Sequence, residues 1–243
     1  MPDIVNQWPF SHHRIKEDNP GMWQDFYVEG RPFGKVYGYY NDFSNWIADS
    51  WTITEVGTSL QRLSDARNGV LELVTGGTEN DGNNCQLGGS ADSETVGESF
   101  LPAAGKNLWF ECRVASDLWT QHEVFLGLSI QDTSVAESRG ADYIGFRSTD
   151  GSAVIDSQAA STASGASVVA GVVTPTDSIT SFQKLGFKVT GTDKIEFYVN
   201  EVIAGTLTTS IPTTEMKLTM AHTAGDAAAH TLGVDYICCF QDR

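Results

Sequence analysis

The segment from residue 194 to residue 207 constrains the fold more than any other part of this chain. Its first half alternates apolar and polar residues, with Ile195, Phe197 and Val199 in the apolar positions. A period of two is typical of a β-strand with one face in a core. Asn200 and Glu201 separate this run from a second one. Because asparagine tolerates positive φ, this pair predicts the tight turn of a β-hairpin.

Similar alternating runs follow one another from residue 42 to the end of the chain. Turn-rich stretches separate the runs, of which the clearest cover residues 51–56, 69–75, 108–114, 123–131, 143–147, 154–157, 184–189, 217–222 and 230–240. Many short strands at regular spacing predict an all-β sandwich or barrel. The Ala/Ser/Thr-rich stretch 157–170 is either a weak strand pair or an exposed loop. We predict that residues 41–243 form one β-sandwich of two antiparallel sheets.

Residues 1–40 have a different character. They combine four prolines with nine aromatic residues and show no helical or strand period; the aromatic residues are Trp8, Phe10, Trp23, Phe26, Tyr27, Phe33, Tyr37, Tyr39 and Tyr40. This composition predicts an extended N-terminal arm that is too apolar for a disordered tail. Its rings must be buried, either on the chain's own sandwich or on another subunit. Because aromatic residues dominate interface hot spots, we predict that the nine form an interface, with Trp8, Phe10 and Trp23 as anchors.

The charge of the chain excludes one class of partner. A formal net charge of -16 would repel nucleic acid phosphates, so we expect no nucleic acid partner. No stretch has the apolar length of a membrane span, and we expect no membrane partner. The first residues lack the pattern of a secretory signal. The four cysteines have no metal-site or disulfide-scaffold spacing, and we expect synthesis in a reducing cytoplasm.

The sequence offers no clear catalytic set. A glycan-cleaving sandwich needs two facing carboxylates, and Glu72, Glu111 and Glu123 are isolated acids in separate runs. His222 and His230 flank one loop and could face each other across a hairpin, but without a nearby carboxylate they are typical of satisfied surface residues. We therefore predict no catalytic residue, and a protein that is not an enzyme.

The sequence was also searched for a cation site and for a glycan-binding site. The segment Thr78–Asn84 is rich in the oxygen atoms that a hard cation prefers, but the same residues are ordinary turn formers. We predict no metal ion and no cofactor. A lectin would need an aromatic platform, for which Trp109, Trp119 and Tyr198 are the candidates.

The hairpin sequence Tyr198-Val199-Asn200, followed by Gly205-Thr206-Leu207, resembles the concanavalin A-like (laminin G-like) jelly rolls. Residues 41–243 resemble a group of such proteins encoded by tailed bacteriophages, through pieces that run in order along the chain; these include residues 41–43, 49–55, 69–73, 75–81, 98–100, 106–110, 124–130, 184–187 and 234–237. The Glu at position 201 departs from the usual Gly of this hairpin.

This resemblance implies a structural virion protein, of the type that decorates (cements) the capsid exterior of a phage. It implies the major capsid protein as a partner, and we expect a homo-oligomer. The alternative is a lectin-like module that binds a glycan.

Overall fold

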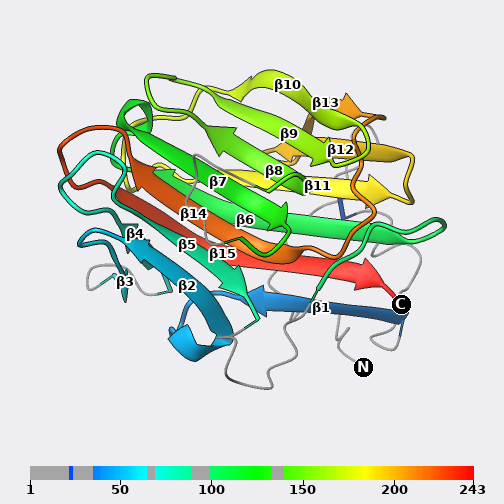
Figure 1. Ribbon diagram of the computed structural model, residues 1–243, viewed down its shortest axis with the longest axis horizontal. Coiled ribbons are helices and arrows are strands. Elements are labelled where there is room, and N and C mark those ends of the chain that lie inside the picture. The colour runs from blue at the N-terminus through cyan, green and yellow to red at the C-terminus, as the bar shows by residue number, and fades with distance from the viewer. Residues whose placement is uncertain (1–21, 24–34, 65–68, 89–98, 133–139) are drawn as a thin grey trace, which may run out of the picture.

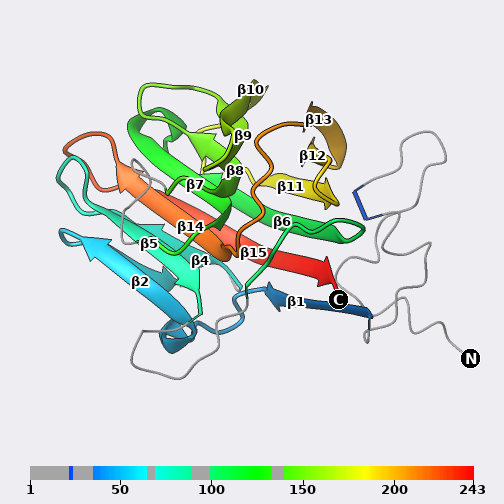
Figure 2. The same cartoon turned by 45° about the vertical axis from the view of Figure 1, so that its right-hand side comes forward.

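The computed structural model describes residues 22–23, 35–64, 69–88, 99–132 and 140–243 of the chain, and these form two stacked antiparallel β-sheets (Figures 1 and 2). The predicted all-β sandwich of two antiparallel sheets is confirmed. Besides the strands, the described residues include two short 3-10 helices, η3 (Ala48–Ser50) and η4 (Trp119–Gln121). No helix in the described ranges is long and apolar enough to cross a membrane.

One sheet has eight strands. Seven of them form a continuous order, β13 (Val202–Leu207), β12 (Lys194–Val199), β11 (Gln183–Thr190), β6 (Asn107–Ser116), β15 (Thr231–Asp242), β4 (Leu71–Val74) and β3 (Leu60–Leu63). The eighth, β1 (Val36–Asn41), pairs with the C-terminal half of β15, beyond the part that pairs with β4. Figure 1 shows β1 lying along the end of β15, close to the C-terminus.

The second sheet has seven strands. Their order is β10 (Gly165–Val173), β9 (Ile155–Ser161), β8 (Tyr143–Ser148), β7 (His122–Ser129), β14 (Lys217–Ala224), β5 (Gly82–Leu87) and β2 (Trp51–Val56). The stretch 157–170, for which the sequence left two alternatives, belongs mostly to the paired strands β9 and β10. Residues 82–84, which the sequence assigned to a turn-forming segment, belong to strand β5.

The core lies between the sheets and collects the inward side chains of both. Phe110 and Phe187 stack across neighbouring strands of the eight-stranded sheet with ring centroids 4.8 Å apart. Leu126 and Met220 supply matching inward positions from the seven-stranded sheet, and all four side chains are almost fully buried. The two-residue alternation read from the sequence therefore does position one face of each strand in a shared core.

The predicted hairpin joins β12 to β13. Asn200 has φ 48° and Glu201 has φ 74°, so both central residues are left-handed, as a type I′ turn requires. Two contacts with the neighbouring strand support this turn. The backbone N–H of Lys184 donates to Asn200 Oδ1 (3.0 Å), and Lys184 Nζ pairs with Glu201 Oε1 (2.7 Å). The ion pair gives Glu201 a role at a position where glycine would be conformationally easier.

The predicted boundary between arm and sandwich at residue 40 falls inside a strand. Tyr37, Tyr39 and Tyr40 lie on β1 and form register pairs with β15. They therefore belong to the eight-stranded sheet. Five of the nine predicted interface residues, namely Trp8, Phe10, Phe26, Tyr27 and Phe33, lie outside the described residues. The interface role stays a prediction.

Trp23 and Met22 cover part of the outward face of the eight-stranded sheet. There they join a second apolar cluster with Trp109, Tyr198, Cys238 and Phe240. Trp23 is 2% exposed, and its indole N–H donates to the buried carboxylate of Glu111 (2.9 Å). The other oxygen of Glu111 accepts a hydrogen bond from the Tyr236 hydroxyl (2.6 Å). This part of residues 1–40 thus buries its ring on the chain's own sandwich.

We predict that Trp23→Ala lowers the free energy of unfolding by about 3–5 kcal/mol, because it empties a buried aromatic position and removes one partner of Glu111. Trp23→Phe keeps most of the ring and should cost about 1–3 kcal/mol for the lost hydrogen bond. Urea unfolding of the full chain measures both. Val202→Ala, at a position 54% exposed, is the control. Equal stability of Trp23→Ala and the parent chain would contradict the prediction.

Candidate functional site

Three histidines meet at one end of the sandwich. His122 begins β7, His222 lies in β14, and His230 stands just before β15, and all three are buried. The ring centroid of His122 lies 4.8 Å from the ring centroid of His222 and 6.1 Å from that of His230. The pairing of β14 with β7 brings His222 to His122. The loop from β14 to β15, which lie in different sheets and form no hairpin, brings His230 to the same place.

The inner pair consists of His122 and His222. His222 Nε2 lies 2.9 Å from His122 Nδ1, and His222 Nδ1 lies 3.0 Å from the carbonyl oxygen of Leu73 in the opposite sheet. Because a carbonyl only accepts, Nδ1 of His222 carries a proton and Nε2 accepts one from His122. Ser116 Oγ lies 3.3 Å from His122, and the Trp119 ring packs edge-on against it. This chain of bonds ties the two sheets together inside the core.

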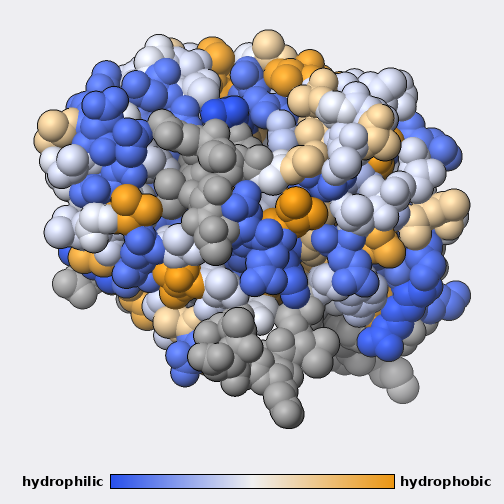
Figure 3. Space-filling view, in the orientation of Figure 1, coloured by the Kyte–Doolittle hydropathy of each residue, from blue (hydrophilic) through white to orange (hydrophobic). Residues whose placement is uncertain are grey.

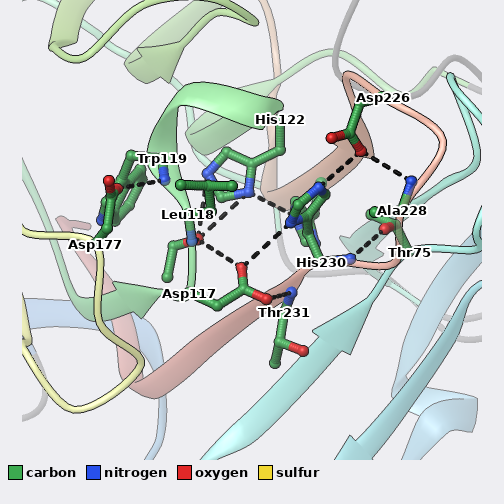
Figure 4. A network of polar contacts seen from close by, with 12 residues as sticks. Thr75, Asp117, Leu118, Trp119, His122, Asp177, Asp226, Ala228, His230 and Thr231 are labelled. Atoms are coloured by element: carbon green, nitrogen blue, oxygen red, sulfur yellow. Dashed lines mark hydrogen bonds and ion pairs between the residues drawn. The ribbon is translucent and has the colours of Figure 1, made fainter.

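The outer histidine is held by carboxylates. His230 Nε2 lies 2.9 Å from Asp226 Oδ1, and His230 Nδ1 lies 3.7 Å from Asp117 Oδ1. Figure 4 shows His230 between these two acids, with Asp117 also accepting the backbone N–H of Thr231 (3.0 Å). The backbone N–H of His230 donates to the Thr75 hydroxyl (2.9 Å). The network therefore joins the loops that follow β4, β6 and β14.

Burial sets the charge state of the inner pair. Desolvation, reinforced by the neighbouring histidines, holds the pKa of His122 well below its usual range. Desolvation also lowers the pKa of His222 to about 3, against the smaller raising effect of the Leu73 carbonyl and together with the lowering effect of His230. The hydrogen bond from His230 lowers the pKa of the exposed Asp226 carboxyl. At neutral pH the inner pair is uncharged.

This arrangement stabilises the fold and does not form an open catalytic site. Ser116 and His122 are each 0% exposed, so no substrate can reach a Ser–His pair there. The sequence indicated that His222 and His230 are surface residues without a carboxylate partner. This was wrong, because both are buried and His230 lies beside the carboxylates of Asp117 and Asp226. Asp226 stands four residues before His230, and that spacing was the available signal.

The other predicted ligand positions also have clear placements. No group of three or more His, Cys, Asp or Glu side chains among the described residues is arranged to hold a metal ion. The candidate lectin platforms Trp109, Trp119 and Tyr198 are at most 5% exposed, so none can stack on a sugar. All four cysteines are buried, and none of them forms a disulfide in the described part of the chain. Cys238 and Cys239 lie in two different apolar clusters, because adjacent residues of a strand point to opposite faces.

The outward face of the seven-stranded sheet has polar side chains in register. One row crosses six strands through the partners Asp156, Arg147, Phe125, Ala221, Asn84 and Thr54. The next row crosses the same strands through Gln158, Gly145, Gly127, Thr219, Gln86 and Thr52. Phe125 and Ala221, in the middle of the first row, are 0% and 3% exposed, so a ligand across the strands would meet the polar ends of that row and not its centre.

The side of this face over β5 is occupied by the chain itself. Gln86 Nε2 donates to the Ile130 carbonyl (3.0 Å), and Gln86 Oε1 accepts the backbone N–H of Asp132 (2.7 Å). Asn84 Nδ2 donates to the Asp132 carbonyl (3.0 Å). The residues that follow β7 thus reach across β14 to β5. Gln86 and Asn84 are almost fully buried, so among the described residues the partly exposed polar side chains considered below lie on the opposite side of the face.

The accessible part lies over β7, β8 and β9. Arg147 Nη2 lies 3.5 Å from Glu123 Oε2, and the two side chains are 24% and 12% exposed. The buried Nε of Arg147 has no hydrogen-bond partner. The Tyr143 hydroxyl donates to Gln158 Oε1 (3.5 Å), a long bond that a ligand could compete with. This group of Glu123, Arg147, Tyr143, Asp156 and Gln158 is named the β7–β9 polar face below.

Three comparisons with known proteins bear on this geometry. No family model matches the chain, and no curated protein matches it. Among solved structures, Bacillus licheniformis beta-glucanase is similar over 83% of this chain and 96% of its own length, with a TM-score of 0.56 and 13% identity. The Emp47p carbohydrate recognition domain has a TM-score of 0.54 at 10% identity, covering 87% of this chain and 99% of that domain. The kappa-carrageenase from Pseudoalteromonas carrageenovora has a TM-score of 0.53 at 15% identity, covering 88% and 98%.

These likenesses show a concanavalin A-like jelly-roll fold, which confirms that part of the sequence resemblance. They contradict our prediction that the protein is not an enzyme. Solved structures with this fold include a beta-glucanase and a carrageenase, so the architecture is one that glycan hydrolases use. At 13% and 15% identity the likeness shows the fold alone. The phage assignment has no counterpart in these comparisons.

We predict that acid destabilises the protein through the inner histidine pair. The unfolded chain binds protons near the ordinary histidine pKa of about 6.5, whereas folded His222 stays neutral down to about pH 3. The unfolded state therefore binds more protons across this window, and stability falls as pH drops from about 7 towards 3. The loss attributable to His222 should be roughly 3–5 kcal/mol.

Urea unfolding at pH 7.5, 6.0 and 5.0 measures this dependence. His222→Leu should be less stable than the parent at pH 7.5, because it leaves the Leu73 carbonyl without its donor, but its stability should depend less steeply on pH. An unchanged pH slope in this variant would show that other groups control the acid sensitivity.

Proposed function

We propose that this protein binds a neutral glycan on the β7–β9 polar face. The observation that carries the proposal is the in-register pair of Asp156 and Arg147, with Glu123, Tyr143 and Gln158 on the same face of the sheet. Four of these side chains are partly exposed and Gln158 is 8% exposed, and together they offer both donors and acceptors at fixed positions. Sugar hydroxyl groups need such partners, and rigid strands hold them more accurately than loops would.

The charge of the chain supports a neutral ligand. Glu123 lies 3.5 Å from the guanidinium of Arg147, Asp156 is the register partner of Arg147 and accepts the N–H of Gly171 (2.6 Å), and the whole chain carries a formal net charge of -16. A sulfated or uronic polysaccharide would meet net repulsion at long range. The named functions of proteins with this fold, a beta-glucanase and a carbohydrate recognition domain, agree with a glycan ligand.

Figure 3 is consistent with a polar recognition surface. On the side that it shows, hydrophilic and intermediate side chains dominate the coloured area, and apolar ones are scattered singly. Scattered apolar residues are normal for a protein surface, whereas a broad apolar patch would favour a protein partner. The predicted capsid role, with a major capsid protein and a homo-oligomer on the capsid exterior, stays a prediction that derives from the sequence resemblance.

The test is calorimetric titration of the full chain with neutral oligosaccharides from β-glucan, mannan and galactan, alongside carrageenan and alginate oligosaccharides. We expect a neutral ligand to bind and the anionic ones to bind at least tenfold more weakly. Arg147→Ala and Gln158→Ala should each lower the affinity at least tenfold, which corresponds to about 1.4 kcal/mol.

Arg62→Ala is the matched control. Arg62 pairs with Glu72 across neighbouring strands on the outward face of the other sheet, at 3.0 Å. This change removes an equivalent arginine without touching the β7–β9 polar face, so the affinity should stay as in the parent. Equal effects of Arg147→Ala and Arg62→Ala, or a preference for anionic glycans, would refute the proposal.

Reducing-end release is measured in the same samples. Cleavage of a neutral glycan that is lost in Glu123→Gln or Asp156→Asn would place hydrolysis on this face and support the ligand assignment. Cleavage that neither change affects would place the glycan elsewhere and contradict it.

A further inference from the structure

The outward face of the eight-stranded sheet has a gap in its side chains at Gly186 on β11. Gly186 is the register partner of Glu111 on β6 and of Tyr198 on β12, so the gap lies between a carboxylate and a phenol ring. A Cβ atom at Gly186 would lie 2.9 Å from Met22 Cε and 3.0 Å from Met22 Sδ. The methyl end of Met22 therefore fills this gap, which is named the Gly186 pit below.

Aromatic side chains surround the Gly186 pit. Trp109 and Tyr198 belong to the apolar cluster that Met22 and Trp23 join, and both are at most 5% exposed. They are two of the three ring platforms that the sequence suggested. Met22 and Trp23 thus cover a surface on which two aromatic side chains stand beside a pit in the strand row.

Glu111 places a negative charge beside the pit. It is 3% exposed, and its carboxylate accepts hydrogen bonds from the Trp23 indole N–H (2.9 Å) and the Tyr236 hydroxyl (2.6 Å). Both donors are neutral. Arg113, two residues along β6 on the same face, pairs with Asp235 at 2.5 Å. A positive group entering the pit would therefore meet a carboxylate that forms no ion pair in the described part of the chain.

We propose that the Gly186 pit binds a methylated ammonium group, and that Met22 and Trp23 act as its internal competitor. Methyl groups on a positive nitrogen match the methyl group that Met22 places in the pit, and aromatic faces attract such cations. The formal net charge of -16 favours a cationic ligand at long range. This site and the β7–β9 polar face lie on different sheets, so the two proposals are independent.

The internal competitor sets the apparent affinity of the pit. A ligand can enter only those molecules in which the side chains of Met22 and Trp23 have left the sheet. The apparent affinity is therefore lower than the intrinsic affinity by the fraction of such molecules. Removing the two side chains removes this penalty, and the ligand in turn favours the uncovered state.

The test is calorimetric titration of the full chain with choline chloride, at an ionic strength held constant with NaCl. The double variant Met22→Ala, Trp23→Ala should bind choline at least about tenfold more tightly than the parent. The uncharged analogue, in which a tert-butyl group replaces the trimethylammonium group, has the same shape without the charge. It should bind the double variant at least about tenfold more weakly than choline does.

Two further changes in the double variant separate the charge from the shape of the site. Glu111→Gln removes the charge, and Gly186→Ala fills the pit without changing any charge, so each should weaken choline binding at least about tenfold. Glu72→Gln is the matched control, because Glu72 is a buried acid on the outward face of the same sheet. It should leave the choline affinity unchanged, and so should Arg147→Ala on the other sheet.

Met22→Ala alone opens the pit and keeps the hydrogen bond between Trp23 and Glu111, so it provides the same comparison should the double variant fail to fold. The proposal is overturned if the opened variants do not bind choline, or bind it no more tightly than the parent. Equal affinity for choline and its uncharged analogue, or an affinity that Glu111→Gln leaves unchanged, would also overturn it.

Discussion

The eight-stranded sheet depends on the pairing of one long strand, β15. This strand has twelve residues and pairs with β6 along one edge. Along its other edge it pairs first with β4 and then with β1, on either side of a register shift between Val234 and Tyr236 in its pairing with β6. The C-terminal strand β15 therefore pairs with two strands from the first third of the chain, β4 and β1. Non-local pairing of this kind makes folding slow, because the centre of the sheet cannot form before the C-terminus is available.

The outward faces of the two sheets are closed in different ways. On the eight-stranded sheet the face is apolar around Trp109 and Phe240, and Met22 and Trp23 cover it. On the seven-stranded sheet the rows of this face end in polar side chains, and Ile130 and Asp132, after β7, hydrogen-bond to Gln86 on its β5 side. A polar face can stay in contact with water at little cost, whereas an apolar face must be covered. This difference favours the seven-stranded sheet as the surface for a soluble, hydroxyl-rich ligand.

The sequence predicted those elements whose signal is local. The hairpin at Asn200 and Glu201 and most strands of both sheets follow from a two-residue period and from turn chemistry. Strand β5 was missed because Asn83, Asn84 and Gln86 have low strand propensity, and their amides find partners only after folding. Tyr37 and Tyr39 lie two residues apart, but Tyr40 breaks the alternation, and the proline-rich segment before them concealed a strand that pairs with the far end of the chain.

The candidate sites were harder to predict because they depend on register between distant strands. Arg147 and Phe125 face each other only because β8 follows β7 in the sheet. The histidine cluster depends on register in the same way, because His122 and His222 lie on paired strands. An imidazole can be buried neutral, so His122 and His222 satisfy each other at neutral pH. Residues 122 and 222 are 100 positions apart in the sequence, so no local pattern shows that the two imidazoles meet.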